Sequence, residues 1–97
     1  MAIVRVTVTD GDPGELVDRY QRVQQRLQND GGEFPPAGLK VHTAMKTPTG
    51  LRIANIWESE EASDAFWPRV QNALSEEGGD PGEMKIEQYE VINLVTA

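Results

Sequence analysis

The apolar residues of this chain repeat with two different periods, and the order of those periods limits the possible folds more than any other feature. Residues 3–9, IVRVTVT, place Val4, Val6 and Val8 on one side and Arg5, Thr7 and Thr9 on the other, which is typical of a strand. From residue 13 to about 29 the spacing becomes three or four, which predicts a helix whose apolar face is formed by Leu16, Tyr20, Val23 and Leu27.

The start of this helix and of a second one carry capping residues. Asp12 is the expected N-cap of the first helix, and Ser59 is the expected N-cap of the second. Glycines at 31–32 and 78–79 are expected to end the two helices. Because Pro68 lacks an amide hydrogen and disfavours helical geometry before it, we expect the second helix to divide or bend there.

Three further segments have the pattern of strands, residues 39–47, 51–58 and 84–95, and the tight turn TPTG joins the first two. The order of elements is therefore β-α-β-β-α-β. Short connections and right-handed crossovers make this order an α+β fold of the ferredoxin-like kind, with a four-stranded antiparallel sheet. A chain of 97 residues is expected to form a single domain, 1–97.

Two helices can cover only one face of such a sheet, yet the predicted strands are apolar on both sides. Ile53 and Trp57, for example, alternate with Ala54 and Ile56. Antiparallel sheets with one solvated face usually alternate more cleanly between apolar and polar residues. We therefore expect a second copy of the chain to cover the other face, giving a homodimer joined through its sheet faces.

The composition of the chain excludes several classes of partner and cofactor. The net charge is -7, from 16 acidic and 9 basic residues, and the basic residues are scattered, so neither nucleic acid nor a membrane surface is an expected partner. The absence of cysteine suits the cytoplasm, and no apolar run approaches membrane-spanning length. With one histidine and no cysteine, no metal site is expected, and without a phosphate-binding glycine motif no cofactor is expected either.

The hairpin formed by residues 39–58 places candidate functional residues together. If the turn is formed by residues 47–50, cross-strand partners have numbers that sum to 97, so His42 lies opposite Asn55 and Lys40 opposite Trp57. Tyr20 and Phe66 could approach this face from the helices. A partly apolar cleft with a few polar groups is the general form of a small-molecule site, here for an apolar or aromatic ligand.

The stretch from Gly38 to Trp67, GLKVHTAMKTPTGLRIANIWESEEASDAFW, resembles the dimeric α/β-barrel superfamily, which includes antibiotic biosynthesis monooxygenases and stress-responsive barrel proteins. The resemblance implies that two ferredoxin-like subunits share a barrel, with a pocket between sheet and helices in each. It also implies pocket residues of the types Asn, Trp and His, for which the candidates here are Asn55, Trp57, Trp67 and His42. A haem-degrading member would carry a histidine in its second helix, and residues 60–77 contain none, so haem is not expected.

Two functional hypotheses remain open. In the first, the protein is an enzyme that oxygenates or isomerises an aromatic or polyketide-like compound without a cofactor. His42 would act as the base and Asn55 would stabilise developing negative charge, while the substrate would be held by Trp57, Trp67, Phe66 and Tyr20. In the second, the protein is a non-catalytic dimeric binding or stress-related protein, and the same aromatic residues build its core and interface.

Overall fold

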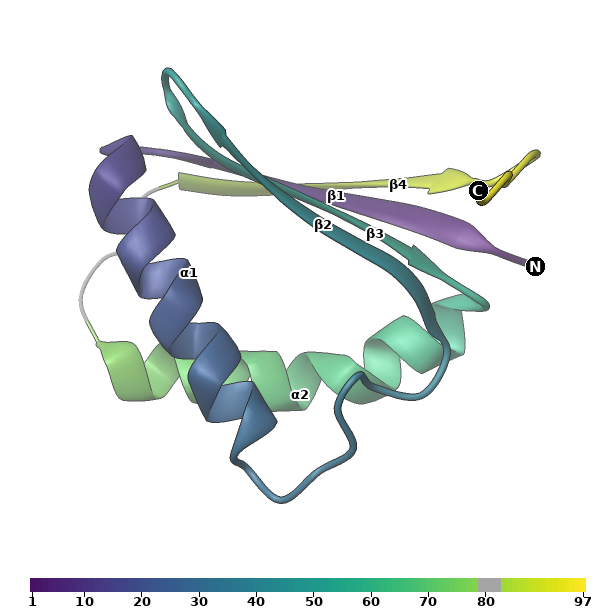
Figure 1. The fold of residues 1–97 in the computed structure, drawn as a ribbon, viewed down its shortest axis with the longest axis horizontal. Coiled ribbons are helices and arrows are strands. Elements are labelled where there is room, and N and C mark those ends of the chain that lie inside the picture. The colour runs from purple at the N-terminus through teal and green to yellow at the C-terminus, as the bar shows by residue number, and fades with distance from the viewer. Residues whose placement is uncertain (79–82) are drawn as a thin grey trace.

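The chain folds in the predicted order in a computed structural model that describes residues 1–78 and 83–97 (Figure 1). The elements are β1 (Ile3–Asp10), α1 (Pro13–Gln28), β2 (Leu39–Thr47), β3 (Gly50–Trp57), α2 (Glu60–Glu77) and β4 (Glu83–Glu90). The four strands form one antiparallel sheet in the order β2-β3-β1-β4. Both helices lie on the same side of this sheet (Figure 1). The ferredoxin-like α+β fold predicted from the sequence is therefore confirmed.

The predicted caps are present at both helix starts. The Asp12 carboxylate accepts a hydrogen bond from the amide of Gly14 at 3.3 Å, and the Ser59 hydroxyl accepts one from the amide of Ala62 at 3.1 Å. These bonds satisfy amide groups that have no partner within the first turn of a helix. Gly79, expected to help end the second helix, lies outside the described residues.

Pro68, which was expected to divide or bend the second helix, does not divide it, because α2 runs continuously from Glu60 to Glu77 with Pro68 inside it. The side chains on both sides of the proline pack against the same apolar cluster of α1, including Phe66 before it and Val70 after it. This shared burial holds the two halves of α2 in one helix despite the hydrogen bond that proline cannot make.

Two predicted boundaries also differ from the structure. The last strand ends at Glu90 and not at residue 95, because its neighbour β1 begins at Ile3, directly opposite Glu90. Beyond that point the amide of Val91 donates to the carbonyl of Ala2 at 2.9 Å, and no partner strand continues. In the hairpin, Trp57 pairs with Leu39 and not with Lys40, since an irregularity between Leu39 and Val41 shifts the register.

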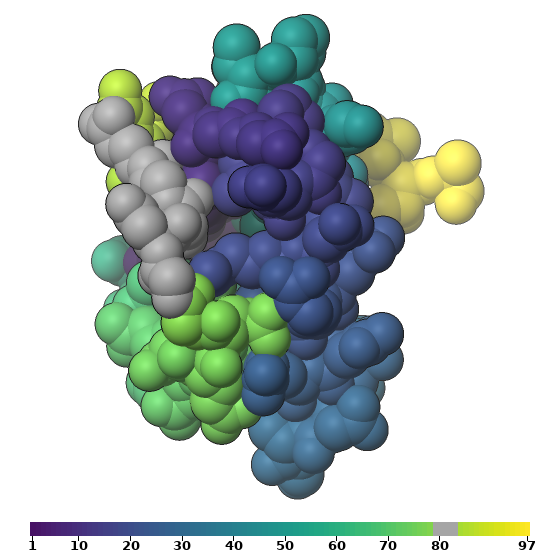
Figure 2. Space-filling model, turned by 90° about the vertical axis from the view of Figure 1, so that its left-hand side faces the viewer, coloured from purple at the N-terminus to yellow at the C-terminus, as the bar shows by residue number. Residues whose placement is uncertain are grey.

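The core has two parts. Between the helices, Val23 and Leu27 of α1 pack with Ala73 of α2. Between helices and sheet, the buried apolar side chains are Ile3, Leu16, Leu51 and Trp57. Figure 2 shows α1 lying along the carboxyl end of α2, while the last residues of the chain project away from this body.

The face of the sheet opposite the helices is open and carries many apolar residues. Ile3, Arg5 and Trp57 point toward the helices, so the alternate residues point away from them. Those residues form a partly exposed surface, hereafter the open face, whose apolar members include Val4, Val6, Val8, Val41, Ala54, Ile56 and Tyr89. It also carries the charged residues Arg52 of β3 and Lys85 and Glu87 of β4. No helix among the described residues is long and apolar enough to cross a membrane.

Candidate functional site

A row of four polar side chains crosses the sheet on its helix-covered face. The registers of the three strand pairs place His42 opposite Asn55, Asn55 opposite Arg5, and Arg5 opposite Gln88. The predicted His42–Asn55 pairing is therefore confirmed. Because each pair is directly cross-strand, the four side chains emerge side by side toward the helices.

The hydrogen bonds of His42 define the local geometry. Its Nδ1 lies 2.5 Å from Asn55 Oδ1, and its Nε2 is hydrogen-bonded to the hydroxyl of Tyr20. The Tyr20 and His42 rings are stacked, with centroids 5.9 Å apart and 11° between their planes. The structure thus brings together three of the six predicted site residues.

Tyr20 reaches His42 because it belongs to the apolar stripe of α1. Leu16, Val23 and Leu27 of that stripe are buried, so the helix presents Tyr20 to the β2–β3 part of the sheet. Partial burial raises the pKa of the Tyr20 phenol above its usual value of 10.0. At neutral pH the hydroxyl is therefore protonated and available as a hydrogen-bond donor.

Arg5 is a member of this row that sequence reasoning did not single out. Its guanidinium donates to Gln88 Oε1 and to the buried Ser63 hydroxyl, both at 2.7 Å, and forms ion pairs with Asp64 and Glu60 of α2. The sequence does contain a signal for it, because Arg5 interrupts an otherwise uncharged strand on the same side as Thr7 and Thr9. To select Arg5 as a site residue, however, one must know that this side of β1 faces the helices.

The predicted aromatic residues form a separate group. Trp57 is 3% exposed and packs against Phe66, with centroids 5.8 Å apart and 46° between the ring planes. Trp67, in contrast, is 36% exposed. No aromatic pair joins Trp67 to Trp57 or to Tyr20 in the described part of the chain. The structure therefore brings Trp57 and Phe66 together and leaves Trp67 toward solvent.

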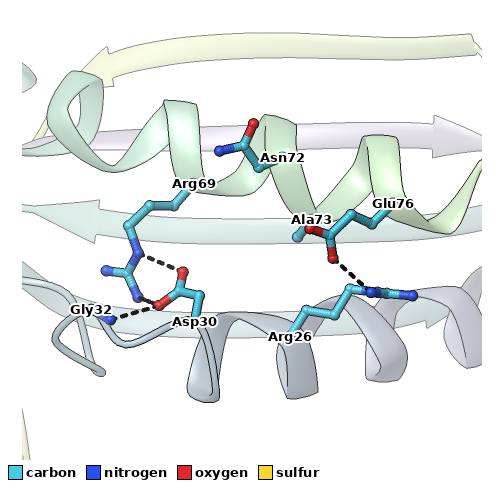
Figure 3. A pocket seen from close by; sticks show the side chains of 7 residues that line it. All are labelled: Arg26, Asp30, Gly32, Arg69, Asn72, Ala73 and Glu76. Carbon is cyan, nitrogen blue, oxygen red and sulfur yellow. Dashed lines mark hydrogen bonds and ion pairs between the residues drawn. The ribbon is translucent and has the colours of Figure 1, made fainter.

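A groove of about 280 Å³ lies elsewhere, between the carboxyl end of α1 and α2 (Figure 3). Its charges are already paired: Arg69 donates two hydrogen bonds to the Asp30 carboxylate, both at 2.8 Å, and Arg26 pairs with Glu76 at 2.6 Å. The amide of Gly32 also donates to Asp30. Since these charged groups already bond to one another, we interpret the groove as a place where ion pairs link α1 and the residues after it to α2.

Metal-ligating side chains do not gather in the described residues. No group of three or more His, Cys, Asp or Glu side chains stands in a position to hold a metal ion there. The row itself offers an imidazole, two amides and a guanidinium, and Tyr20 of α1 adds a phenol.

Comparisons by sequence are negative: no protein-family model matches the chain, and no curated protein is significantly similar to it. Comparisons by structure are positive. The fold is similar to that of a candidate antibiotic biosynthesis monooxygenase from Chloroflexus aurantiacus, with a TM-score of 0.76, 13% identity, and coverage of 99% of this chain and 98% of that chain.

Two further similar structures have described activities. One is the heme-degrader MhuD from Mycobacterium tuberculosis, with two hemes in its active site (TM-score 0.67, 18% identity, coverage of 97% and 99%). The other is SnoaB, a cofactor-independent oxygenase from Streptomyces nogalater (TM-score 0.56, 13% identity, coverage of 99% and 96%). The chain thus has the ferredoxin-like fold of the antibiotic biosynthesis monooxygenase-like proteins, as the resemblance in residues 38–67 predicted.

Proposed function

We propose that this protein is a homodimeric α/β-barrel enzyme that oxygenates an aromatic or polyketide-like compound without a cofactor. The observation that carries the proposal is the hydrogen-bonded set Tyr20–His42–Asn55 on the helix-covered face of the sheet. The similarity to a cofactor-independent oxygenase of the same fold supports it.

The site suits substrates with an acidic hydroxyl group next to an activated carbon. The Tyr20–His42 pair takes the hydroxyl proton, and the negative charge that results spreads onto the carbon. The Oδ1 atom of Asn55 is bonded to His42, so its Nδ2 group is the donor that faces this charge. The carbanion then bonds to O₂ as a peroxide anion, and the proton held by the Tyr20–His42 pair returns to it to give a hydroperoxide. Loss of water, which also takes the remaining hydrogen of that carbon, leaves a carbonyl group.

Trp57 and Phe66 form the apolar boundary of the site in this proposal. Trp57 is two residues from Asn55 on β3, so both side chains point toward the helices. The edge of the Trp57–Phe66 pair would contact the substrate ring, while the pair itself ties α2 to the sheet. Trp67, because of its exposure, would contact a substrate only at the rim.

The proposed dimer explains the open face. A 97-residue chain buries a small share of its surface, and here the helices leave one whole face of the sheet uncovered. The valines of β1, with Ala54 and Ile56 on β3, form the apolar part of a surface that a second copy would match by two-fold symmetry. Two such sheets packed together would form the barrel.

The proposed activity is tested by oxygen uptake with 1,8-dihydroxyanthrone as the probe. The wild-type protein should consume O₂ faster than buffer alone, and His42→Gln should lower the rate about 100-fold, because it removes the proton acceptor. Lys46→Gln, an exposed change on the same strand, should keep the wild-type rate. Uptake that is unchanged in His42→Gln would contradict the assignment.

A non-catalytic role remains the second candidate, and one observation favours it: Trp57 and Phe66 are packed together as a core pair would be. Under this alternative the protein binds an aromatic compound without changing it. Tight binding of the anthrone, measured by quenching of tryptophan fluorescence, together with no oxygen uptake above buffer would select the binding protein over the enzyme.

A further inference from the structure

We infer that Tyr20 Oη, and not the His42 ring, is the atom that takes the proton from the substrate, and that His42 stores the proton that Tyr20 gives up. This inference rests on the proposed function and assigns the proton path within the same site. It reverses the roles expected from the sequence, where His42 was the base and Tyr20 a binding residue.

The hydrogen bond to Asn55 determines the form of the imidazole. Asn55 Oδ1 can only accept, so His42 Nδ1 must be the donor. In a neutral imidazole the other nitrogen, Nε2, then carries no hydrogen and accepts. Its partner is the Tyr20 hydroxyl, which must therefore donate to it. The lone pair that a histidine base would need is already occupied by Tyr20.

The same bonds leave Tyr20 with an open acceptor. A phenol oxygen that donates its only hydrogen to Nε2 still has lone pairs for an incoming hydroxyl. The parallel stack of the two rings, with 5.9 Å between their centroids, keeps the phenol on the helix side of the imidazole. Tyr20 is thus the group that α1 brings to the imidazole.

The proton step balances without any further reactant. The substrate O–H bond breaks and its proton bonds to Tyr20 Oη, while the original phenol proton moves to His42 Nε2. The products are a substrate anion and an imidazolium, which remains hydrogen-bonded to Asn55 Oδ1. No free phenolate forms, which matters because burial raises the pKa of the Tyr20 phenol and disfavours that anion.

The charged groups around the relay permit the imidazolium. The nearest cation in the row is Arg5, one strand beyond Asn55. Its charge is balanced by Asp64, at 3.0 Å, and by Glu60, both on α2. Tyr20 is the titratable group that α1 brings to the imidazole. The relay therefore lies beside an ion cluster in which two carboxylates face one guanidinium, and this excess of negative charge favours an imidazolium.

The geometry is tested by ¹⁵N NMR, which is unambiguous because His42 is the only histidine. At neutral pH we expect hydrogen on Nδ1 and the shift of a hydrogen-bonded acceptor for Nε2. In Tyr20→Phe, which keeps the stacked ring, the Nε2 signal should move to the position of an unbonded nitrogen while Nδ1 keeps its hydrogen. Hydrogen on Nε2 in the wild type would overturn the inference.

The chemistry is tested by oxygen uptake with 1,8-dihydroxyanthrone. Tyr20→Phe should lower kcat at least tenfold with little change in KM, whereas Lys46→Gln, the exposed control on the strand of His42, should match the wild type. A Tyr20→Phe rate equal to or above the wild-type rate, in a variant with an unchanged melting temperature, would show His42 acting directly and overturn the relay.

These results separate the relay from the proposed function. If His42→Gln is inactive but Tyr20→Phe is fully active, the enzyme assignment stands and the relay is wrong. If the wild-type protein consumes no oxygen, the enzyme assignment is wrong, and the NMR result alone decides whether Tyr20 donates to His42.

Discussion

Trp57, the last residue of β3, packs against Phe66 of α2, and this contact joins the sheet to the helix. Trp57 is among the most buried side chains of the chain, and Arg69 lies over the other ring of the pair, 5.0 Å from the Phe66 centroid. The two tryptophans of the chain therefore have different roles, because Trp67 points toward solvent.

This difference predicts unequal effects of two matched substitutions. Trp57→Ala should lower the free energy of unfolding by about 3–5 kcal/mol, since it removes a buried ring and leaves a cavity. Trp67→Ala should lower it by less than about 1 kcal/mol. Urea unfolding followed by circular dichroism measures both changes. Equal losses in the two variants would contradict the assignment of Trp57 to the core.

Gly50 predicts a strict requirement for glycine in the hairpin. Its φ is 156°, and a Cβ atom added there would lie 2.0 Å from the carbonyl oxygen of Thr9 on β1. Because that oxygen belongs to the backbone of a central strand, it cannot move aside. Gly50→Ala should cost about 3 kcal/mol or more. Gly14→Ala is the control and should cost much less in the same thermal unfolding measurement, because its φ is not positive and the nearest atom to the added Cβ is Asp12 Oδ1 at 3.9 Å.

The Asp30–Arg69 pair predicts a pH-dependent contribution to stability. Hydrogen bonds from Arg69, and then from the amide of Gly32, hold the pKa of the Asp30 carboxyl below its usual value of 3.8. A carboxyl whose pKa is lower in the folded state stabilises the fold above the unfolded pKa and loses that effect as the pH falls through the folded pKa. Asp30→Asn should therefore lower the melting temperature at pH 7 and narrow its gap to the wild type below about pH 3.8.

The measurement is a set of thermal melts between pH 7 and pH 2.5 on the wild type and on Asp30→Asn. Asp18→Asn, which changes an exposed carboxyl on α1, serves as the control. A melting-temperature difference for Asp30→Asn that stays constant down to the lowest pH would contradict an ionised Asp30 as the source of the stabilisation.

If the proposed dimer forms through the open face, a charged residue placed there should dissociate it into monomers. Val6→Glu places a carboxylate at the centre of this face, where a second copy would have to bury it, at a cost of several kcal/mol. The variant should remain folded and sediment as a monomer at micromolar concentration, while the wild type sediments as a dimer. Gln21→Glu adds the same charge on the exposed side of α1 and should leave the dimer intact. A monomeric wild type would reject the dimer.

Local signals in the sequence predicted most of the fold because they act over short distances. The caps at Asp12 and Ser59, the turn at residues 47–50 and the change between strand and helix periods each involve a few neighbouring residues. The pairing of His42 with Asn55 followed from the same logic, since a tight turn sets the register of the strands it joins.

Two of the failures of prediction occurred where distant segments meet. The continuity of α2 through Pro68 depends on packing against α1, and the end of β4 depends on where β1 begins. In both cases the contacting element, α1 or β1, is far away in sequence, so no local sequence pattern could predict the result.

For the candidate site, the sequence by itself determined which residue types share a face of the hairpin, because strand period and turn length place His42 beside Asn55. Only the tertiary structure decided that Tyr20 covers His42, that Arg5 joins the row from β1, and that Trp67 stays outside it. Those outcomes depend on how α1 and α2 lie across the sheet, and that placement results from burial of the whole apolar surface and not from any one segment.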